Sequence, residues 1–261
     1  MTVRLAARFV VVTGAAGSIG RAILARLTAE GATVAALDLR AVPTEQLEAL
    51  AVPPGAVVHG GSVDVTDRSA LEAAAERLEA RLGRPPDAVV AAAGVQGFVP
   101  VEQLPLDELE RVMRVNVGGP LVTSQVFAPR LRRAGGGSVV VLASVQGRIA
   151  NPESAHYAAS KAAALSLTRS LAVALAPDRI RVNAVAPGMI DSDMWDEADR
   201  ELARLRGVPA GEPRRQRLAR VPLGRPGTTE DVAAAVAYLV SDDSAYITGE
   251  CLHVSGGDLM L

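Results

Sequence analysis

The sequence predicts an α/β fold in which a doubly wound sheet of about seven mostly parallel strands carries helices on both faces. Short apolar runs rich in Val and Ala alternate with longer helical stretches, and each run ends in small or polar residues. Buried parallel strands have this appearance. The 261 residues contain no internal repeat, linker or low-complexity segment, so we expect a single domain over 1–261.

The expected strands follow one another at regular intervals, at 8–14, 33–38, 56–64, 88–94, 138–144, 181–188 and 251–257. Helical stretches near 18–30, 68–82, 107–132, 155–176 and 228–241 are long enough for the crossovers between parallel strands. Segment 189–224 differs, because it is charged, interrupted by Gly and Pro, and holds the only tryptophan. Ligands bind beyond the carboxyl ends of such strands, so we expect this segment to form a substrate lid.

Composition excludes several classes of protein. With 49% hydrophobic and 21% charged residues, the chain can bury a large core. A formal net charge of −2 provides no strong field for nucleic acid or an anionic membrane. No apolar run approaches the roughly 20 residues of a membrane span, and the apolar start is better interpreted as a first strand than as a secretion signal. A soluble, cytoplasmic protein is expected.

The cysteine and histidine residues argue against a metal or disulfide framework. One cysteine, Cys251, leaves no partner for an intrachain disulfide. The three histidines do not have the spacing of metal ligands. We therefore expect no tightly bound metal.

A glycine-rich turn indicates a dinucleotide site. In "VVVTGAAGSIGRAI" (10–23), Gly14, Gly17 and Gly20 lie between the first expected strand and the first helix. Glycine lets the backbone approach a pyrophosphate, which the N–H groups and dipole of the helix N-terminus attract. Asp38, at the end of the second strand, suits a residue that binds the ribose hydroxyls and repels a 2′-phosphate. NAD is favoured over NADP, although Arg40 could attract that phosphate.

A tyrosine and a lysine stand four residues apart in "AHYAASKAA" (155–163), so Tyr157 and Lys161 share one helix face. Ser144 ends the fifth expected strand and adds a hydroxyl at the same edge of the sheet. A ketone that accepts hydride needs a proton donor, and an alcohol that loses hydride needs a base. Tyrosine, with a pKa of about 10, is a poor base at neutral pH. We expect the adjacent ammonium of Lys161 to lower the pKa of Tyr157.

These motifs resemble those of the short-chain dehydrogenase/reductase family over about residues 8–257. The turn is similar to its TGxxxGxG signature, with Ser18 in the place of the middle glycine, and "RVNVGG" adds Asn116. The resemblance implies a Rossmann-type fold and a catalytic set of Asn116, Ser144, Tyr157 and Lys161. Tyr157 would be the general acid/base and Lys161 would also hold the nicotinamide ribose. Ser144 would stabilise the charge on the substrate oxygen, and Asn116 would anchor a relay water.

The resemblance also implies a binding site for the cofactor. "AAAG" (91–94) stands where the family has NNAG, so the hydrogen bonds of both asparagines must be made otherwise. "APGMIDSDM" (186–194) is similar to the family's PGxIxTxM, with Ser192 in the place of the threonine. The implied cofactor-binding residues are Gly14, Gly17, Ser18, Ile19, Gly20, Asp38, Asp64, Val65, Gly94, Tyr157, Lys161, Pro187, Gly188, Ile190 and Ser192. Family members are commonly homotetramers, so we expect a homotetramer or homodimer.

The lid segment and the residues after it are similar to acetoin/2,3-butanediol dehydrogenases and to sorbitol-type polyol dehydrogenases. This favours a small secondary alcohol, diol or polyol and its ketone as substrates. Candidate pocket residues are Gln96, Gln146, His156, Met189 and Trp195. A 3-oxoacyl-carrier-protein reductase, a cyclic dihydrodiol dehydrogenase and a non-catalytic NAD-binding sensor or scaffold remain as alternatives.

Overall fold

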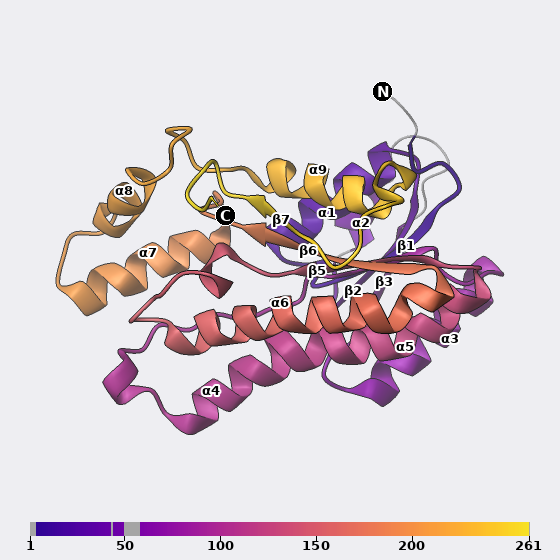
Figure 1. Cartoon of the computed structure of the whole chain (residues 1–261), viewed down its shortest axis with the longest axis horizontal. Helices are drawn as coiled ribbons and strands as arrows, with labels where there is room; N and C mark the ends of the chain where they lie inside the picture. The colour runs from indigo at the N-terminus through magenta and orange to yellow at the C-terminus, as the bar shows by residue number, and fades with distance from the viewer. Residues whose placement is uncertain (1–3, 43, 50–57, 261) are drawn as a thin grey trace.

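Seven parallel strands form one sheet in the computed structural model, which describes residues 4–42, 44–49 and 58–260. The order across the sheet is β3-β2-β1-β4-β5-β6-β7 (Figure 1). This confirms the predicted doubly wound α/β fold. The order of the strands reverses at β1, with β2 and β3 on one side of it and β4 to β7 on the other. Residues 56–57 of the third expected strand lie outside the described residues. The strands are β1 (Phe9–Thr13), β2 (Thr33–Asp38), β3 (Val58–Ser62), β4 (Ala88–Ala91), β5 (Gly137–Leu142), β6 (Ile180–Pro187) and β7 (Cys251–Val254).

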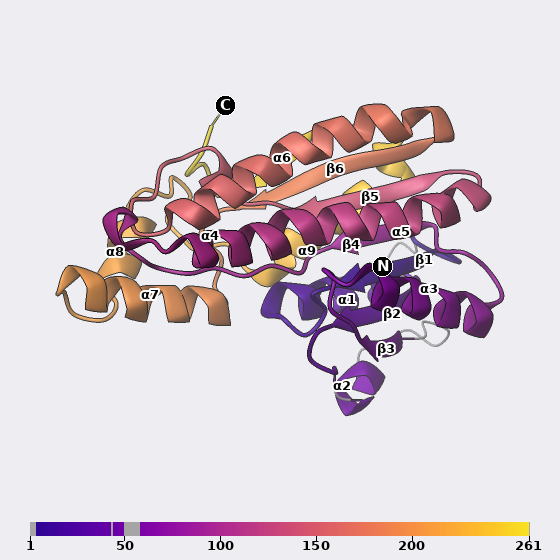
Figure 2. The same ribbon diagram turned by 90° about the horizontal axis from the view of Figure 1, so that it is seen from below.

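Helices cover both faces of the sheet. In Figures 1 and 2, α1 and α9 lie on one face and α3, α5 and α6 on the other, while α7 and α8 extend beyond one end of the sheet. None of the described helices is long and apolar enough to cross a membrane. The helices are α1 (Ser18–Ala29), α2 (Thr44–Ala49), α3 (Arg68–Leu82), α4 (Leu106–Met113), α5 (Gly119–Arg133), α6 (Ala155–Leu175), α7 (Asp193–Arg206), α8 (Glu212–Leu218) and α9 (Thr229–Val240).

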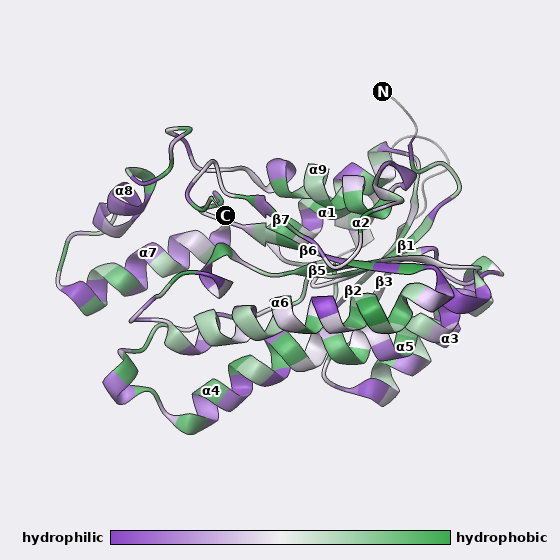
Figure 3. Ribbon diagram, in the orientation of Figure 1, coloured by the Kyte–Doolittle hydropathy of each residue, from purple (hydrophilic) through white to green (hydrophobic). Residues whose placement is uncertain are grey.

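The core consists of two layers separated by the sheet. Along β1, Val10 and Val12 pack with α1 and α9, whereas Phe9 and Val11 pack with α3, α5 and α6. Successive side chains of a strand point to opposite faces, and here both faces are buried. This explains why the strands read as continuous apolar runs. Figure 3 shows the contrast with α8, which is largely hydrophilic.

Two features of the helices differ from expectation. The single helix expected at 107–132 is divided by a π-helical turn, Arg114–Gly118, between α4 and α5. Such a turn adds one residue without disturbing the apolar pattern, so the sequence gives no signal for it. Segment 189–224, for which no helix was predicted, contains α7 and α8. Gly207, with a φ of +64°, ends α7 in the left-handed conformation that glycine favours.

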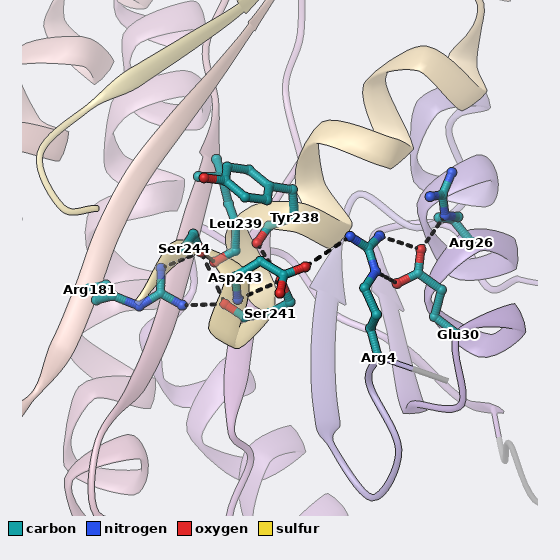
Figure 4. Close-up of polar contacts among 9 residues, drawn as sticks. All are labelled: Arg4, Arg26, Glu30, Arg181, Tyr238, Leu239, Ser241, Asp243 and Ser244. Carbon is teal, nitrogen blue, oxygen red and sulfur yellow. Dashed lines mark hydrogen bonds and ion pairs between the residues drawn. The ribbon is translucent and has the colours of Figure 1, made fainter. Parts of the chain in front are cut away.

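A polar network joins the first and last crossover helices near the amino ends of the strands (Figure 4). Arg4 donates two hydrogen bonds, of 3.0 and 2.8 Å, to the Glu30 carboxylate at the end of α1. A third donor of Arg4 reaches Asp243, just after α9, at 3.2 Å. The Glu30 side chain is only 8% exposed, and it also accepts from Arg26. Desolvation raises the pKa of Glu30, but its arginine partners outweigh this and the net pKa is lowered.

We expect Glu30→Gln to cost about 1–3 kcal/mol of unfolding free energy at pH 7, because charge-assisted hydrogen bonds in a buried place are lost. The pKa of Glu30 is lower in the folded state, so its contribution is present above the unfolded pKa. It should disappear as pH falls through the folded pKa, and the two proteins should then converge. Urea unfolding at several pH values measures this. Glu201→Gln is the control, because it removes the exposed partner of Arg204, and it should cost about 0.5 kcal/mol or less. Equal losses of unfolding free energy in Glu30→Gln and Glu201→Gln would contradict the expectation.

Candidate active site

A cavity of about 800 Å³ runs along the carboxyl ends of β1, β2, β4, β5 and β6 and continues under α7. All but two of the residues predicted for the site line it; Asn116 and His156 do not. The sheet explains this arrangement, since residues that follow parallel strands meet at one edge. The predicted residues on the wall are Gly14, Gly17, Ser18, Ile19, Gly20, Asp38, Asp64, Val65, Gly94, Gln96, Ser144, Gln146, Tyr157, Lys161, Pro187, Gly188, Met189, Ile190, Ser192 and Trp195.

The glycine turn brings backbone close to backbone. Gly14 has a φ of +70°, and a Cβ there would lie 2.4 Å from the Ala93 nitrogen. At Gly20 a Cβ would lie 2.1 Å from the Gly14 oxygen. The sharp turn between β1 and α1 therefore requires glycine at both places, and it leaves the N-terminus of α1 at the cavity wall. Gly17 precedes α1 as its N-cap, and no side chain caps the helix there, which suits an anion.

Asp38 connects the ends of β1 and β2. Its carboxylate accepts hydrogen bonds of 2.9 Å from the backbone N–H of Ala16 and from that of Arg40. The side chain is therefore fixed at the cavity wall with its negative charge. The Arg40 guanidinium is largely exposed, and its Nε lies 4.0 Å from the same carboxylate. In the next loop, Asp64 accepts from the backbone and hydroxyl of Thr66.

Ser144, Tyr157 and Lys161 come together where β5 ends and α6 begins. Tyr157 is 7% and Lys161 5% exposed, and the Lys161 Nζ lies 5.6 Å from the centre of the Tyr157 ring. Nζ donates a hydrogen bond of 2.8 Å to the backbone oxygen of Leu142. A Cβ at Gly147 would lie 2.8 Å from the Lys161 backbone. Glycine there lets α6 approach the sheet closely.

The expectation that Lys161 lowers the pKa of Tyr157 was wrong. Burial raises the pKa of Tyr157 to about 12, opposed only by hydrogen bonding with the side chain of Ser144. Burial also lowers the pKa of Lys161 to about 8. Removal from water disfavours the charged form of each group, and this burial is the largest cause of both shifts. Both side chains are thus held toward their neutral forms.

Asn116 lies behind the wall, within the π-helical turn. Its amide nitrogen donates to the Val95 oxygen at 2.8 Å and to the Ser160 hydroxyl at 2.9 Å. Its amide oxygen accepts from the Val95 nitrogen at 2.8 Å. Asn116 therefore fixes the loop after β4 against α6. The "AAAG" segment depends on backbone contacts, with the Ala92 nitrogen donating to the Thr13 oxygen at 3.2 Å.

His156 is buried against α4 and not on the cavity wall. Its Nε2 lies 3.7 Å from the Glu108 carboxylate, and a Cβ at Gly97 would meet both side chains. Burial lowers the pKa of His156, so the neutral ring is favoured. Gly97, and not His156, therefore lines the cavity at this point. The other four candidate pocket residues lie on the wall.

Segment 189–224 is joined to the nucleotide turn at the start of α7 and is held together by hydrogen bonds of its own. At the start of α7, the Asp193 carboxylate accepts from the Ser18 hydroxyl at 2.7 Å and pairs with Arg21. Deeper in the lid, buried Asp199 accepts from the backbone N–H of Gly211 and Arg214, which fixes the start of α8. Asp193, Met194, Glu197, Glu201 and Arg217 of segment 189–224 also line the cavity and were not among the predicted site residues. The helical spacing of Met194, Glu197 and Glu201 on α7 could have indicated these three, whereas nothing nearby in sequence indicates Arg217.

Comparison with known proteins agrees with this geometry. Residues 14–258 match a family model described as enoyl-(acyl carrier protein) reductase. The chain is 36% identical to (3R)-3-hydroxyacyl-CoA dehydrogenase from Canis lupus familiaris, covering 97% of both chains. It is 33% identical to sorbitol dehydrogenase from Cereibacter sphaeroides, covering 98% of this chain and 99% of the relative. The crystal structure of NAD+-bound xylitol dehydrogenase matches with a TM-score of 0.89 and 32% identity, over 97% of this chain and all of that one.

The chain belongs to the short-chain dehydrogenase/reductase family. The resemblance deduced from the motifs is thereby confirmed, and the chain is an alcohol dehydrogenase/ketoreductase that uses a nicotinamide cofactor. The described residues fit that cofactor, because one cavity connects the Gly14–Gly20 turn and the Asp38 carboxylate with Tyr157. They contain no group of three or more His, Cys, Asp or Glu that could hold a metal ion.

In this short-chain dehydrogenase, we expect Gly20→Ala to lower the unfolding free energy by about 1–3 kcal/mol, because the new Cβ would overlap the Gly14 carbonyl. Gly17→Ala is the matched control. A Cβ there would lie 3.5 Å from the same oxygen, an ordinary contact, so stability should change by less than about 1 kcal/mol. Urea unfolding measures both. A Gly20→Ala protein as stable as Gly17→Ala would contradict the close approach in the turn.

Proposed function

We propose that this chain is an NAD-dependent dehydrogenase that interconverts a small polyol or diol and its hydroxyketone, with Tyr157 as general acid/base. The supporting observation is the placement of Tyr157, Ser144 and Lys161 on one wall of a cavity that continues to the Gly14 turn and Asp38. A proton-transferring side chain and a nucleotide site thus share one enclosed space.

Tyr157 would move the proton. In ketone reduction its neutral phenol donates a proton to the carbonyl oxygen, which gains negative charge as hydride arrives. In alcohol oxidation the phenolate takes that proton back. With a pKa of about 12, the side chain is in its proton-donating form over the whole neutral range. Tyr157 therefore already carries the proton needed for ketone reduction. Alcohol oxidation, in contrast, requires the phenolate to be stabilised as the reaction proceeds.

Ser144 and Lys161 would supply that stabilisation. The Ser144 hydroxyl lowers the pKa of Tyr157 and would donate to the substrate oxygen. Lys161 is anchored by the Leu142 oxygen and would bind the ribose nearest the reacting ring. When bound, the nicotinamide gives or takes the hydride. With a pKa of about 8, Lys161 can also accept or release a proton near neutral pH, which suits a proton relay.

The remaining cofactor residues would hold the nucleotide in order along the cavity. The N-terminus of α1 at Ser18 would bind the pyrophosphate, and Asp38 would accept from the adenosine ribose hydroxyls. Asp64 and Val65 would lie at the adenine. Past the catalytic group, the backbone at Ile190 and the hydroxyl of Ser192 would bind the carboxamide, on the turn formed by Pro187 and Gly188. Segment 189–224 would close over the site as a lid.

NAD is the cofactor that this site favours. The Asp38 carboxylate is fixed by two backbone N–H groups, so it cannot easily turn away from a 2′-phosphate. Arg40 lies beside that carboxylate and is mostly exposed, where water screens its charge. The net effect on a phosphate at this place is repulsion.

A 3-hydroxyacyl thioester is the second candidate substrate. It is favoured by one observation, the 36% identity with (3R)-3-hydroxyacyl-CoA dehydrogenase over nearly the whole chain. Its reaction, oxidation of a secondary alcohol to a ketone, needs the same four catalytic residues. Turnover of xylitol and sorbitol compared with that of acetoacetyl-CoA separates the two. The homotetramer and the cytoplasmic location deduced from the sequence stay predictions.

We expect Tyr157→Phe to lower kcat by at least about 100-fold for xylitol oxidation with NAD, because the general acid/base is lost. NADH affinity, measured by fluorescence titration, should change little. Tyr246→Phe is the matched control, since Tyr246 is fully exposed, and it should keep wild-type turnover. Equal turnover by Tyr157→Phe and the wild type would disprove the proposed role.

We expect the wild type to have a higher kcat/KM with NAD than with NADP, and Asp38→Asn to reduce this ratio at least about tenfold. The substitution removes the negative charge that repels a 2′-phosphate but keeps one acceptor for the backbone N–H groups. Arg40→Met, which leaves the carboxylate in place, should not increase the use of NADP. A wild type that prefers NADP would overturn the assignment of Asp38.

A further inference from the structure

One wall of the cavity is built by α7 and α8 of segment 189–224. Met194, Glu197 and Glu201 lie on α7 at spacings of three and four residues, so they share the helix face that borders the cavity. Trp195 adds an aromatic ring and Arg217 of α8 adds a guanidinium. This wall therefore combines hydrogen-bond donors, acceptors and an aromatic surface.

The guanidinium of Arg217 has more N–H groups than its protein partner uses. The Arg217 side chain is 18% exposed and pairs with the Asp258 carboxylate, which is 3% exposed. Within the described part of the chain, Asp258 is the only hydrogen-bond acceptor recorded for Arg217, and one Nη makes that bond. A guanidinium has five N–H donors, so donors beyond the one used by Asp258 remain on a side chain that lines the cavity. Burial lowers the pKa of Arg217, while Asp258 opposes that shift.

The C-terminal segment fixes Asp258, and thereby Arg217. This segment, yellow in Figure 1, leaves β7 and runs beside the lid. The Gly256 oxygen accepts from the Leu223 nitrogen at 3.1 Å, and a Cβ at Gly257 would lie 2.8 Å from Pro222. The Asp258 nitrogen donates to the Ser255 oxygen at 3.1 Å. The guanidinium is thus oriented before a substrate arrives, which reduces the entropy lost on binding.

The charges at this wall favour a neutral ligand over an anion. Arg217 is balanced by Asp258, and Arg111, which also lines the cavity, is balanced by Glu108. Glu201 is paired with Arg204 through one carboxylate oxygen, and Glu197 adds a further negative charge to the same wall. A carboxylate or phosphate would meet no excess of positive charge there. Hydroxyl groups, in contrast, accept from a guanidinium and donate to carboxylates.

We propose that Arg217 and Glu201 form a subsite that binds the distal hydroxyl groups of an open-chain polyol while its reacting carbon lies at Tyr157. Asp258 is a positioning residue that orients Arg217. The inference rests on the proposed function, since it assigns the substrate of that same site. Because Asp258 belongs to the C-terminal segment, that segment would take part in substrate selection.

The test compares two alcohols that differ in distal hydroxyls, xylitol and 2-butanol, at saturating NAD. Arg217→Met should raise KM for xylitol at least about tenfold, because donors to its hydroxyls are lost. The kcat/KM for 2-butanol should stay within about twofold. Glu201→Gln should raise KM for xylitol in the same selective way. Arg215→Met, on the same helix but exposed, is the matched control and should change neither substrate.

Asp258→Asn tests positioning. It should raise KM for xylitol while leaving kcat nearly unchanged, because the reacting carbon is still handled by Tyr157. Arg217→Lys is a second variant in case Arg217→Met does not fold, since lysine retains the charge. It should still raise KM for xylitol, because one ammonium cannot reproduce the planar fork of donors. Thermal unfolding and NADH affinity of each variant establish that the fold is intact.

Two results would overturn the subsite. One is an equal change for xylitol and 2-butanol in Arg217→Met, which indicates a purely structural role. The other is a larger rise in KM for 3-hydroxybutyrate than for xylitol, which indicates an anion site. Failure of the proposed function is seen separately, in the wild type alone, as absence of NAD-dependent turnover of either alcohol.

Discussion

Burial of Tyr157 and Lys161 at the carboxyl edge of the sheet is the constraint on which the site depends. Neither side chain has the water that would stabilise its charge, so each is shifted toward its neutral form. The fold produces this burial by packing α6 against β6 and against the turn after β5. The Lys161 Nζ lies on the Leu142 oxygen, and Gly147 lets the backbones of that turn and α6 meet. The neutral phenol of Tyr157 can then donate a proton, whereas formation of its phenolate must be stabilised during the reaction.

The rest of the architecture supports that pair. The crossovers on both faces bury the central strands β1 and β4 completely, and the polar groups of the site lie at or beyond the carboxyl ends of the strands. Asn116, in the π-helical turn, ties the loop after β4 to α6 through Val95 and Ser160. The lid is tied to the nucleotide turn through Asp193 and to the C-terminal segment through Arg217. The proposed proton transfer thus resides at the sheet edge, and the proposed substrate contacts reside in the segments that cover it.

Sequence patterns predicted those parts that depend on local spacing. The seven strands, the glycine turn and the Tyr157–Lys161 pair follow from periodicity and from residue types at strand ends. The π-helical turn and the helices of the lid did not, because an inserted residue and short polar helices leave little trace in apolar periodicity. The pKa of Tyr157 was predicted in the wrong direction, since spacing reveals a neighbouring charge but not the loss of water. The contact of Arg217 with Asp258 joins residues far apart in sequence and needed the structure.

The pH dependence of stability tests the burial of this pair most directly. We would measure the unfolding free energy of the wild type and of Lys161→Met by urea denaturation from pH 7 to 10.5. Between pH 8 and 10.5 the folded lysine is neutral while the unfolded lysine still binds a proton, so the wild type should gain stability relative to the variant, by up to about 3 kcal/mol. Tyr157 is common to both proteins, and its effect cancels. A difference that stays constant over this range would show that Lys161 titrates normally and would contradict the account.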